Sequence, residues 1–242
     1  MNPKHSTKKQ IASALYRAKT KLKNTLTPNE YGFLQKQSEL FNKGKDSYSF
    51  FKNNPSRKKE YNTIVNSVVN KSGTIDRRDP DVYIFGGIPA SGKTSLRDRV
   101  KEKTVVIDSD YFKERLSDRY KSPHKKYPLI HSSLLHREAD ILVEKAIKKA
   151  SAEKRDVIID MTASNKEKIM MLAKHFKSKG YDVHFLGILA YPHESITRVV
   201  GRFLVKGRYV PPNYVAQKGN QTNTSILELY RSKVFDSTYL RR

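Results

Sequence analysis

The chain contains no cysteine. Disulfide bonds, thiolate metal sites and cysteine nucleophiles are therefore excluded, and the sequence is compatible with a reducing interior. No apolar run approaches the roughly 18–20 residues that a membrane-spanning helix needs. Residues 1–17, MNPKHSTKKQIASALYR, also lack the apolar stretch of a secretory signal. We therefore expect a cytoplasmic protein with no membrane span.

Acidic residues are scarce beside basic ones. The 242 residues include 24 Asp and Glu against 48 Lys and Arg, which gives a formal net charge of +24 at pH 7. The segment before Pro80 is the more densely charged, with 17 basic and 6 acidic residues. A positive field of this size attracts polyanions. It is either a solvated lysine-rich surface or a contact for nucleic acid, an acidic partner or an acidic lipid surface.

The first third of the chain has the apolar spacing of helices. Apolar residues recur there at three- and four-residue steps, which predicts amphipathic helices over residues 8–26, from Pro28 onward and around 61–69. Thr27 precedes Pro28, and Glu30 follows three residues after Thr27, which is the pattern of a capped helix start. We predict that residues 1–79 form a basic, helical N-terminal extension.

From residue 81 the pattern changes. Short apolar runs alternate with helical stretches, which is typical of a parallel sheet with crossover helices. Strands are predicted at 82–85, 104–107, 157–159 and 183–189. Helices are predicted at about 92–101, 110–117, 131–150, 165–179, 193–206 and 223–235. We therefore predict an α/β fold over residues 80–242, with a parallel sheet flanked by helices.

A complete phosphate-binding motif follows the first predicted strand. Residues Gly87, Ile88, Pro89, Ala90, Ser91, Gly92, Lys93 and Thr94 match G-x-x-x-x-G-K-[ST], and Ser95 continues into a helix. In this motif the glycines let the backbone curl around phosphates, the lysine reaches the β- and γ-phosphates, and the threonine hydroxyl ligates Mg²⁺. We predict that residues 87–95 bind ATP or GTP with Mg²⁺.

Two strand ends offer the carboxylates that phosphoryl transfer requires. Asp108 and Asp110 follow one predicted strand, and Asp160 follows another. The ligand crevice of an open α/β sheet lies outside the carboxyl ends of its strands, where all three acids fall. We predict Asp110 as the general base. Asp108 is either a neighbour of Thr94 and the magnesium waters or a cap for the next helix.

Three arginines lie on or just after the helix predicted over 193–206, namely Arg198, Arg202 and Arg208. Small kinases bring arginines of this kind down from a mobile lid to neutralise transition-state charge. We predict that Arg202 and Arg208 act in catalysis together with Lys93. Because the chain has 48 basic residues, a solvated helix face is the alternative for each arginine.

Four segments, in order, resemble the zeta-toxin family of P-loop kinases: GGIPASGKTSL, VVIDSDYFKERL, DVIIDMTASN and GRFLVKGRYVPPNYV. The resemblance covers roughly residues 80–215 and implies a P-loop kinase domain. That family phosphorylates the 3′-hydroxyl of UDP-N-acetylglucosamine, and a small helical antitoxin blocks its nucleotide site. The resemblance therefore implies a UDP-sugar substrate and a possible antitoxin partner.

The same resemblance assigns roles to individual residues. Lys93 and Thr94 would bind nucleotide and magnesium, Asp110 would be the general base, and Arg202 and Arg208 would contact the phosphates. Asp160 and Thr162 would border the substrate and the metal. An acid on the long helix contacts the sugar in that family. Spacing back from Asp160 gives Glu144 for this role, with Glu138 as a competing choice.

The acceptor of the phosphate stays open at the sequence level. A polynucleotide 5′-kinase uses a P-loop, a similarly placed aspartate and an arginine lid, and would account for the positive charge. A third hypothesis is a protein that binds nucleic acid or a partner through the basic extension and keeps the P-loop domain as a scaffold. RNP-type aromatic motifs and a zinc module are missing from the sequence, which disfavours a dedicated nucleic-acid reader.

Overall fold

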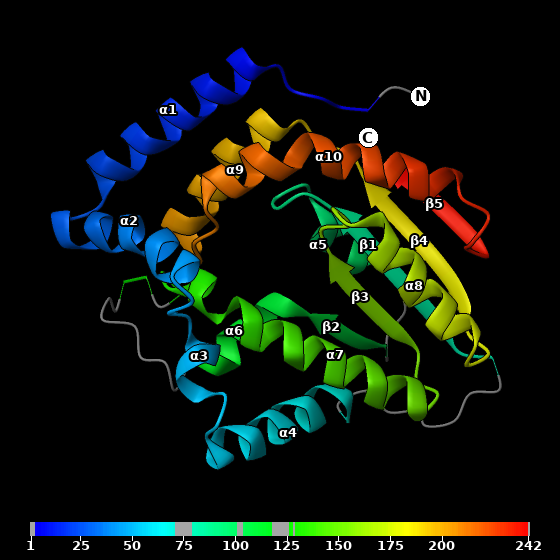
Figure 1. Cartoon of the computed structure of the whole chain (residues 1–242). Coiled ribbons are helices and arrows are strands. Elements are labelled where there is room, and N and C mark those ends of the chain that lie inside the picture. The colour runs from blue at the N-terminus through cyan, green and yellow to red at the C-terminus, as the bar shows by residue number, and fades with distance from the viewer. Residues whose placement is uncertain (1–2, 71–78, 101–103, 118–125, 128, 242) are drawn as a thin grey trace.

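The computed structural model describes residues 3–70, 79–100, 104–117, 126–127 and 129–241. Four helices come first: α1 (Lys8–Thr25), α2 (Pro28–Asn42), α3 (Ser47–Phe51) and α4 (Pro55–Val69). They wrap around one side of a sheet domain (Figure 1). The three N-terminal helices predicted from apolar spacing are confirmed, while α3 and the start of α4 were not expected. Both begin at polar caps, because Asp46 and Asn54 accept hydrogen bonds from backbone amides of the first turns.

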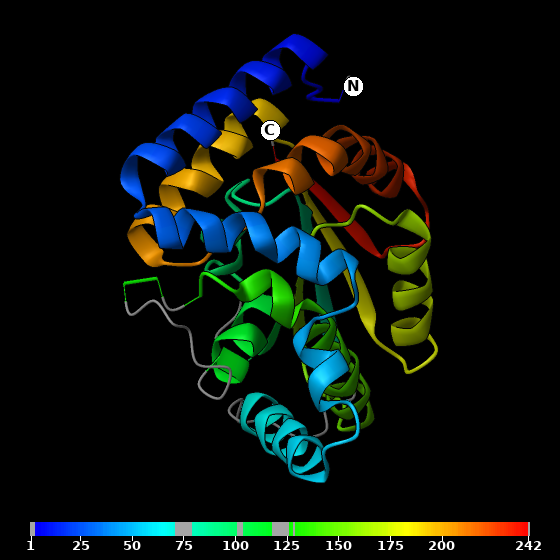
Figure 2. The same cartoon turned by 60° about the vertical axis from the view of Figure 1, so that its left-hand side comes forward.

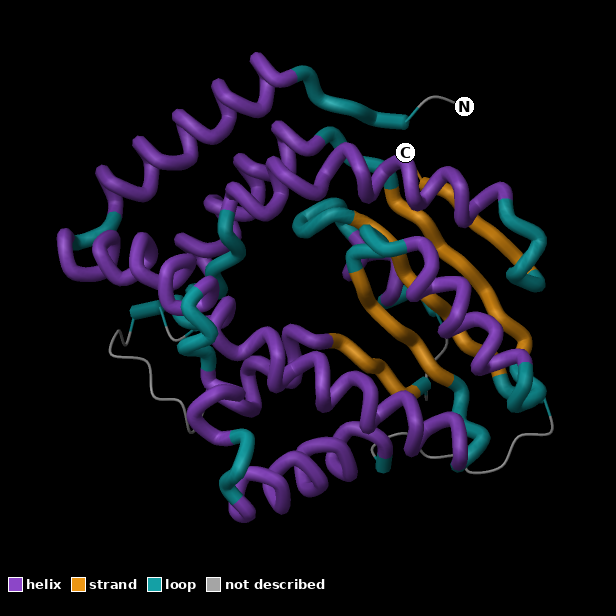
Figure 3. Tube along the Cα trace, in the orientation of Figure 1, coloured by secondary structure: helices purple, strands orange, loops and turns teal. Residues whose placement is uncertain are grey.

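The sheet has five strands, all parallel. Figure 3 shows the strands in orange among the surrounding helices. The strands are β1 (Asp81–Gly87), β2 (Val105–Asp108), β3 (Val157–Met161), β4 (Asp182–Ile188) and β5 (Ser237–Arg241), in the order β2-β3-β1-β4-β5. The four predicted strands are confirmed to within one or two residues at each end. The strand β5 was not predicted, because it lies at the sheet edge and has no fully buried residue to give it an apolar pattern.

The connecting helices are α5 (Lys93–Arg97), α6 (Ser109–Ser117), α7 (His136–Ala152), α8 (Lys166–Lys177), α9 (Pro192–Lys206) and α10 (Pro212–Arg231). A short 3-10 helix, η1 (Ser132–Leu135), precedes α7, so the predicted helix 131–150 is two elements. The helix α10 begins eleven residues before its predicted start at 223. Its first half buries small residues rather than large ones, and a Cβ at Gly219 would lie only 2.6 Å from Pro192.

The N-terminal helices pack into the cores of the sheet domain. Tyr61, Ile64 and Val68 of α4 join the main core, together with sheet residues and the helices α7, α8 and α10. The apolar faces of α1 and α2 form a second core with α9, and both views show α1 running alongside α9 (Figures 1 and 2). Because these helices share their cores with the sheet domain, the packing does not mark a domain boundary, and the boundary at residue 79 stays a prediction. Within the described residues no helix is both long and apolar enough to cross a membrane.

Candidate active site

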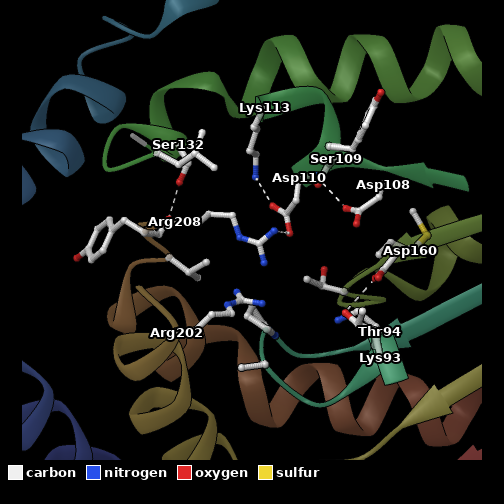
Figure 4. Close-up of a pocket in the computed structure, with 18 of the residues that line it drawn as sticks. Lys93, Thr94, Asp108, Ser109, Asp110, Lys113, Ser132, Asp160, Arg202 and Arg208 are labelled. Atoms are coloured by element: carbon white, nitrogen blue, oxygen red, sulfur yellow. Dashed lines mark hydrogen bonds and ion pairs between the residues drawn. The ribbon is translucent and has the colours of Figure 1, made fainter. Parts of the chain in front are cut away.

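A cavity of about 1450 Å³ opens at the carboxyl ends of β1, β2 and β3 (Figure 4). Its walls come from the loop after β1, the strand ends, α6, η1 and the helices α9 and α10. Ligand crevices form at this edge of open parallel sheets, because the strands end there and the helices diverge. The cavity contains most of the site residues predicted from the sequence.

The loop after β1 has the backbone conformation that its glycines allow. Gly92 has φ of 97° and caps α5 without a side chain. A Cβ at Gly87 would lie 2.5 Å from the Ser91 hydroxyl. Lys93 curls back, so that its ammonium donates to the carbonyls of Gly87 at 2.7 Å and Ile88 at 3.3 Å. The cation is thereby held at the mouth of the loop, facing the cavity.

Most residues of the predicted phosphate loop line the cavity, from Pro89 to Ser95. Ile88 does not, because its side chain is buried in the protein and only its carbonyl faces Lys93. The Ser91 hydroxyl is buried and has no hydrogen-bond partner within the described residues. A buried hydroxyl in this state calls for an external acceptor. A phosphate oxygen meets that requirement.

The carboxylates of Asp108 and Asp160 lie on neighbouring strands, where the two residues are register partners. Arg97 bridges them, with Nη1 3.1 Å from Asp108 and 3.9 Å from Asp160. Lys93 lies 3.8 Å from Asp160. Burial raises the pKa of Asp160 to about 6, opposed by Lys93 and reinforced by Asp108. Two cations thus face two carboxylates at this strand edge, and burial still makes ionisation of Asp160 less favourable than in water.

Asp108 also accepts a hydrogen bond at 2.9 Å from the backbone amide of Asp110, in the first turn of α6. The helix-capping role considered for Asp108 is therefore present in the structure. Its role at a magnesium site stays a prediction.

Asp110 lies in the first turn of α6 and faces the arginines (Figure 4). Its carboxylate is 2.8 Å from Nη1 of Arg208 and 3.4 Å from the ammonium of Lys113. Burial raises the pKa of Asp110, but Lys113, Arg208 and Arg202 outweigh burial and hold it below its usual value. Asp110 is therefore ionised at neutral pH and able to accept a proton.

Two of the three candidate arginines reach the cavity. Arg202 extends from α9 into it, and its buried Nε has no hydrogen-bond partner in the part of the chain that the structure describes. Burial, and after it the neighbouring Arg208, lower the pKa of Arg202. Arg202, Arg208 and Lys113 lie near the single carboxylate of Asp110, so this corner has an excess of positive charge. Arg198 instead lies exposed and pairs with Glu194 at 2.9 Å. The structure thus separates Arg198 from the cavity and brings Arg202 and Arg208 together in it.

The two acids predicted to contact a sugar do not line the cavity. Glu138 is fully buried and binds Arg57 through both carboxylate oxygens, at 2.7 and 3.1 Å, and the Tyr61 hydroxyl at 2.5 Å. The carboxylate of Glu138 thus joins α4 to α7, away from the residues that line the cavity, and its predicted contact with a sugar has no support in this geometry. Glu144 is exposed on α7, two turns beyond His136, which does line the cavity. Thr162, in contrast, lines it as predicted.

Several lining residues had not been singled out from the sequence. Arg97 stands four residues after Lys93, and Lys113 three after Asp110, so each shares a helix face with a predicted residue. That spacing was a usable signal. Gln37 of α2 also lines the cavity, although it comes from the N-terminal helices. No motif marks it.

The oxygen donors at the strand edge suit a magnesium ion. Thr94, Asp108 and Asp160 all line the cavity. No cluster of three or more His, Cys, Asp or Glu side chains within the described residues could hold a metal by itself. Mg²⁺ commonly takes one or two carboxylates and completes its shell with waters and phosphate oxygens. A cation beside Asp160 would oppose the effect of burial on its carboxylate, so these side chains would fit a Mg²⁺ ion held in that mode.

Comparisons with solved structures agree on the fold. A chain of the PezAT chromosomal toxin-antitoxin system of Streptococcus pneumoniae superposes with a TM-score of 0.53 at 19% identity, over 75% of this chain and 76% of that one. The AvrRxo1-ORF1:AvrRxo1-ORF2 complex with sulphate ions gives a TM-score of 0.54 at 14% identity, over 80% of this chain and 67% of that one. Both support the α/β fold described above.

Sequence comparisons give the family. Toxin zeta of Streptococcus pyogenes is 28% identical over 123 residues, which is 47% of this chain and 40% of that protein. Toxin zeta of Enterococcus hirae matches to the same extent, so the alignments span about two fifths of the length of either relative. The model of the Zeta toxin family matches residues 66–241, from the end of α4 to the end of β5. The chain therefore belongs to the Zeta toxin family.

Proposed function

We propose that this protein is a P-loop kinase that transfers the γ-phosphate of ATP or GTP to a hydroxyl of a UDP-N-acetyl sugar. One observation carries the proposal. Lys93 from the phosphate loop, Asp110 from α6, and Arg202 and Arg208 from α9 and the residues directly after it meet in one cavity. A lysine on a glycine-rich loop, a carboxylate and two arginines are the groups that phosphoryl transfer to a hydroxyl requires.

On the nucleotide side, the residues of this chain bind and neutralise phosphate charge. The Lys93 ammonium leaves the loop carbonyls for the β- and γ-phosphates, and the Ser91 hydroxyl donates to a phosphate oxygen. Arg202 lies in a corner with excess positive charge, so it stabilises the charge that develops on the transferring phosphoryl group. Thr94, with Asp108 or Asp160, would hold a Mg²⁺ ion, which would supply positive charge against the phosphates.

On the acceptor side, Asp110 takes the proton of the attacking hydroxyl. Its pairing with Arg208 at 2.8 Å keeps the carboxylate ionised but also weakens it as a base. Movement of the Arg208 guanidinium to the phosphates removes that positive charge from Asp110. The basicity of Asp110 then rises at the step that needs it, so Arg208 couples phosphate binding to proton abstraction.

The size of the cavity supports a large acceptor. About 1450 Å³ exceeds the roughly 300–1,000 Å³ of pockets that hold one drug-sized ligand. A nucleoside triphosphate and a nucleotide sugar can therefore occupy it together. Membership of the Zeta toxin family and the resemblance in the sequence support a UDP-N-acetyl sugar as that acceptor.

We also propose a helical antitoxin as a partner. The support comes from one of the structures that share the fold, which belongs to a toxin-antitoxin system. An antitoxin that covers the nucleotide site would lower the nucleotide affinity of this chain when it is bound.

The test offers labelled ATP and, separately, labelled GTP to the full chain in three reactions. Two of the reactions contain UDP-N-acetylglucosamine or a 5′-hydroxyl oligonucleotide as the acceptor, and the third contains buffer alone as the blank. We expect labelled UDP-sugar, with little product in the other two reactions, and no product from the Lys93→Ala variant. Label on the oligonucleotide alone would instead identify a polynucleotide kinase. Equal transfer by wild type and Lys93→Ala would overturn the assignment of the phosphate loop.

A further inference from the structure

The segment that carries Arg208 is held by the residues before η1. The backbone of Leu129 pairs with that of Arg208, and the Leu129 carbonyl accepts from the Tyr209 amide at 3.3 Å. The Ser132 hydroxyl donates to the Tyr209 carbonyl at 2.5 Å (Figure 4). Both backbone groups of Tyr209 are thus bonded to residues 129–132. The position of Arg208 therefore depends on the position of that turn.

The turn at residues 129–132 is held in its place by one side chain of α2. The Gln37 amide donates through Nε2 to the Ile130 carbonyl at 2.5 Å, and its Oε1 accepts from the Ser133 hydroxyl. Gln37 is 1% exposed, so water does not compete for either bond. A buried amide with both ends bonded fixes its partners, since breaking either bond leaves a polar group unpaired. Gln37 thus contacts the turn at residues 129–132, and that turn is itself bonded to the backbone beside Arg208.

The helix that precedes α2, and the residues before that helix, are anchored on α9 and α10. The preceding helix α1 packs along α9, with the small residues Ala14 and Ala18 in their shared core. Before α1, the Ser6 backbone exchanges two hydrogen bonds with the Asn220 side chain of α10, at 2.9 and 3.0 Å. The Ser6 hydroxyl also accepts from the His193 amide at 3.1 Å. The N-terminal helices therefore connect α9 and α10 with the turn that holds Tyr209.

We propose that Gln37 is a positioning residue for catalysis, which acts through the turn at residues 129–132 to aim Arg208 at the transferring phosphate. This inference rests on the proposed kinase function. It extends the site to a helix that lies outside the match of the family model, which begins at residue 66. Gln37 need not touch the nucleotide, because both of its polar groups are already bonded within the protein.

The first test is a double-mutant cycle on transfer to the acceptor. Gln37→Met keeps the length of the side chain and removes both hydrogen bonds. We expect it to lower kcat roughly 5- to 50-fold with KM for the nucleotide nearly unchanged. In an Arg208→Ala background the same substitution should change kcat by less than about twofold, because the group it positions is gone. Equal losses of kcat in both backgrounds would show a general structural role and overturn the proposal.

The matched control is Ser47→Ala. Ser47 of α3 is also buried, and its hydroxyl donates to the Leu134 carbonyl of η1 at 3.0 Å. The control therefore removes a buried hydrogen bond from the N-terminal helices to the second half of η1, two residues beyond Ser132, whose hydroxyl contacts Tyr209. We expect a lower melting temperature with kcat unchanged.

The second test does not depend on kinase activity. Amide hydrogen exchange of the peptide that contains Tyr209 reports directly on its bond to Leu129. We expect exchange there to be faster in Gln37→Met than in wild type, and unchanged in Ser47→Ala. Wild-type exchange at Tyr209 in Gln37→Met would overturn the proposal. If the wild type transferred phosphate to no acceptor, the proposed function would fail while this measurement still decided whether Gln37 holds the Arg208 segment.

Discussion

At the scale of residues, Asp108 and Asp110 show how two carboxylates two positions apart acquire different surroundings. Asp108 ends β2 and pairs with Arg97, while Asp110 starts α6 and pairs with Arg208 and Lys113. The strand-to-helix turn between them directs one toward the phosphate loop and the other toward the arginines. Because the two carboxylates have different partners, we expect substitutions of Asp108 and Asp110 to affect different steps of the reaction.

Asp110→Asn keeps the shape of the side chain and removes the proton acceptor. We expect turnover to fall by about 10²–10⁴-fold with nucleotide affinity nearly unchanged. Asp108→Asn should instead weaken nucleotide binding in the presence of magnesium. Titration of both variants with ATP and Mg²⁺, followed by single-turnover transfer, separates the two effects. Normal turnover by Asp110→Asn together with inactive but nucleotide-bound Asp108→Asn would reverse the roles.

His131 gives a prediction for the pH dependence of stability. It is fully buried, and burial lowers its pKa from 6.5 to about 4. Between pH 6.5 and pH 4 the His131 side chain binds a proton in the unfolded chain but not in the folded protein. The contribution of neutral His131 to the free energy of unfolding is therefore complete above pH 6.5 and is lost as pH falls toward 4. The shift corresponds to about 3 kcal/mol of the free energy of unfolding.

Urea unfolding at about pH 7 and about pH 4.5 measures this effect. We expect His131→Leu to lose less stability on acidification than the wild type. Ile130→Val is the control, because it removes one methyl group from a fully buried neighbour. It should cost about 0.5–1.5 kcal/mol at either pH. Identical pH dependence in His131→Leu and wild type would assign the acid sensitivity to other groups.

At the scale of elements, a buried ion pair joins α4 to α7. Glu138 binds Arg57 and Tyr61 with no solvent contact. Burial raises the pKa of Glu138, but the hydrogen bonds from Arg57 and Tyr61, together with the charge of Arg57, bring it below its usual value. The pair therefore holds α4 against the sheet domain.

Glu138→Gln should destabilise the protein by about 1–3 kcal/mol, because it removes one of the two carboxylates that pair with the buried Arg57 guanidinium and leaves only Glu60 at 3.0 Å. Nucleotide affinity at a temperature where the variant is folded should be unchanged. Glu144→Gln, on the exposed side of the same helix, should change stability by no more than about 0.5 kcal/mol. Chemical unfolding of both variants measures this contrast. Equal stability of the two would show that the Arg57 pair contributes little.

The elements that the sequence predicts well are those fixed by local patterns. The strands β1 to β4 have buried apolar runs, and the phosphate loop has its glycines and lysine. Because Asp108 and Asp160 come at the ends of two of these predicted strands, their place at one edge of the sheet could also be predicted. The contributions of Gln37 and Glu138 could not be predicted. Each depends on a contact between residues far apart in the chain, 93 positions for Gln37 and Ile130 and 81 for Arg57 and Glu138. Spacing along one helix carries no information about such contacts.

At the scale of the whole molecule, the net charge of +24 is unevenly placed. The helix α1 carries lysines and an arginine but no acidic residue, and its lysines are exposed. Its opposite face packs on α9 through Ala14, Ala18 and Leu22. This packing orients the basic face of α1 toward solvent, where it is available to a polyanion.

The last prediction concerns that face. Replacing Lys19, Lys21 and Lys23 by Gln should weaken binding to duplex DNA and reduce its salt slope by up to about 3, since each phosphate contact contributes about 1. The control replaces three exposed lysines on and after α8, which are Lys168, Lys174 and Lys179. Both variants lose the same charge, so a difference between them reports position rather than total charge. Phosphate transfer to a UDP-sugar should be unchanged in both, because none of the six lysines lines the cavity. Equal losses of DNA affinity in the two variants would mean that polyanions respond to the field of the whole molecule and that α1 is no dedicated contact surface.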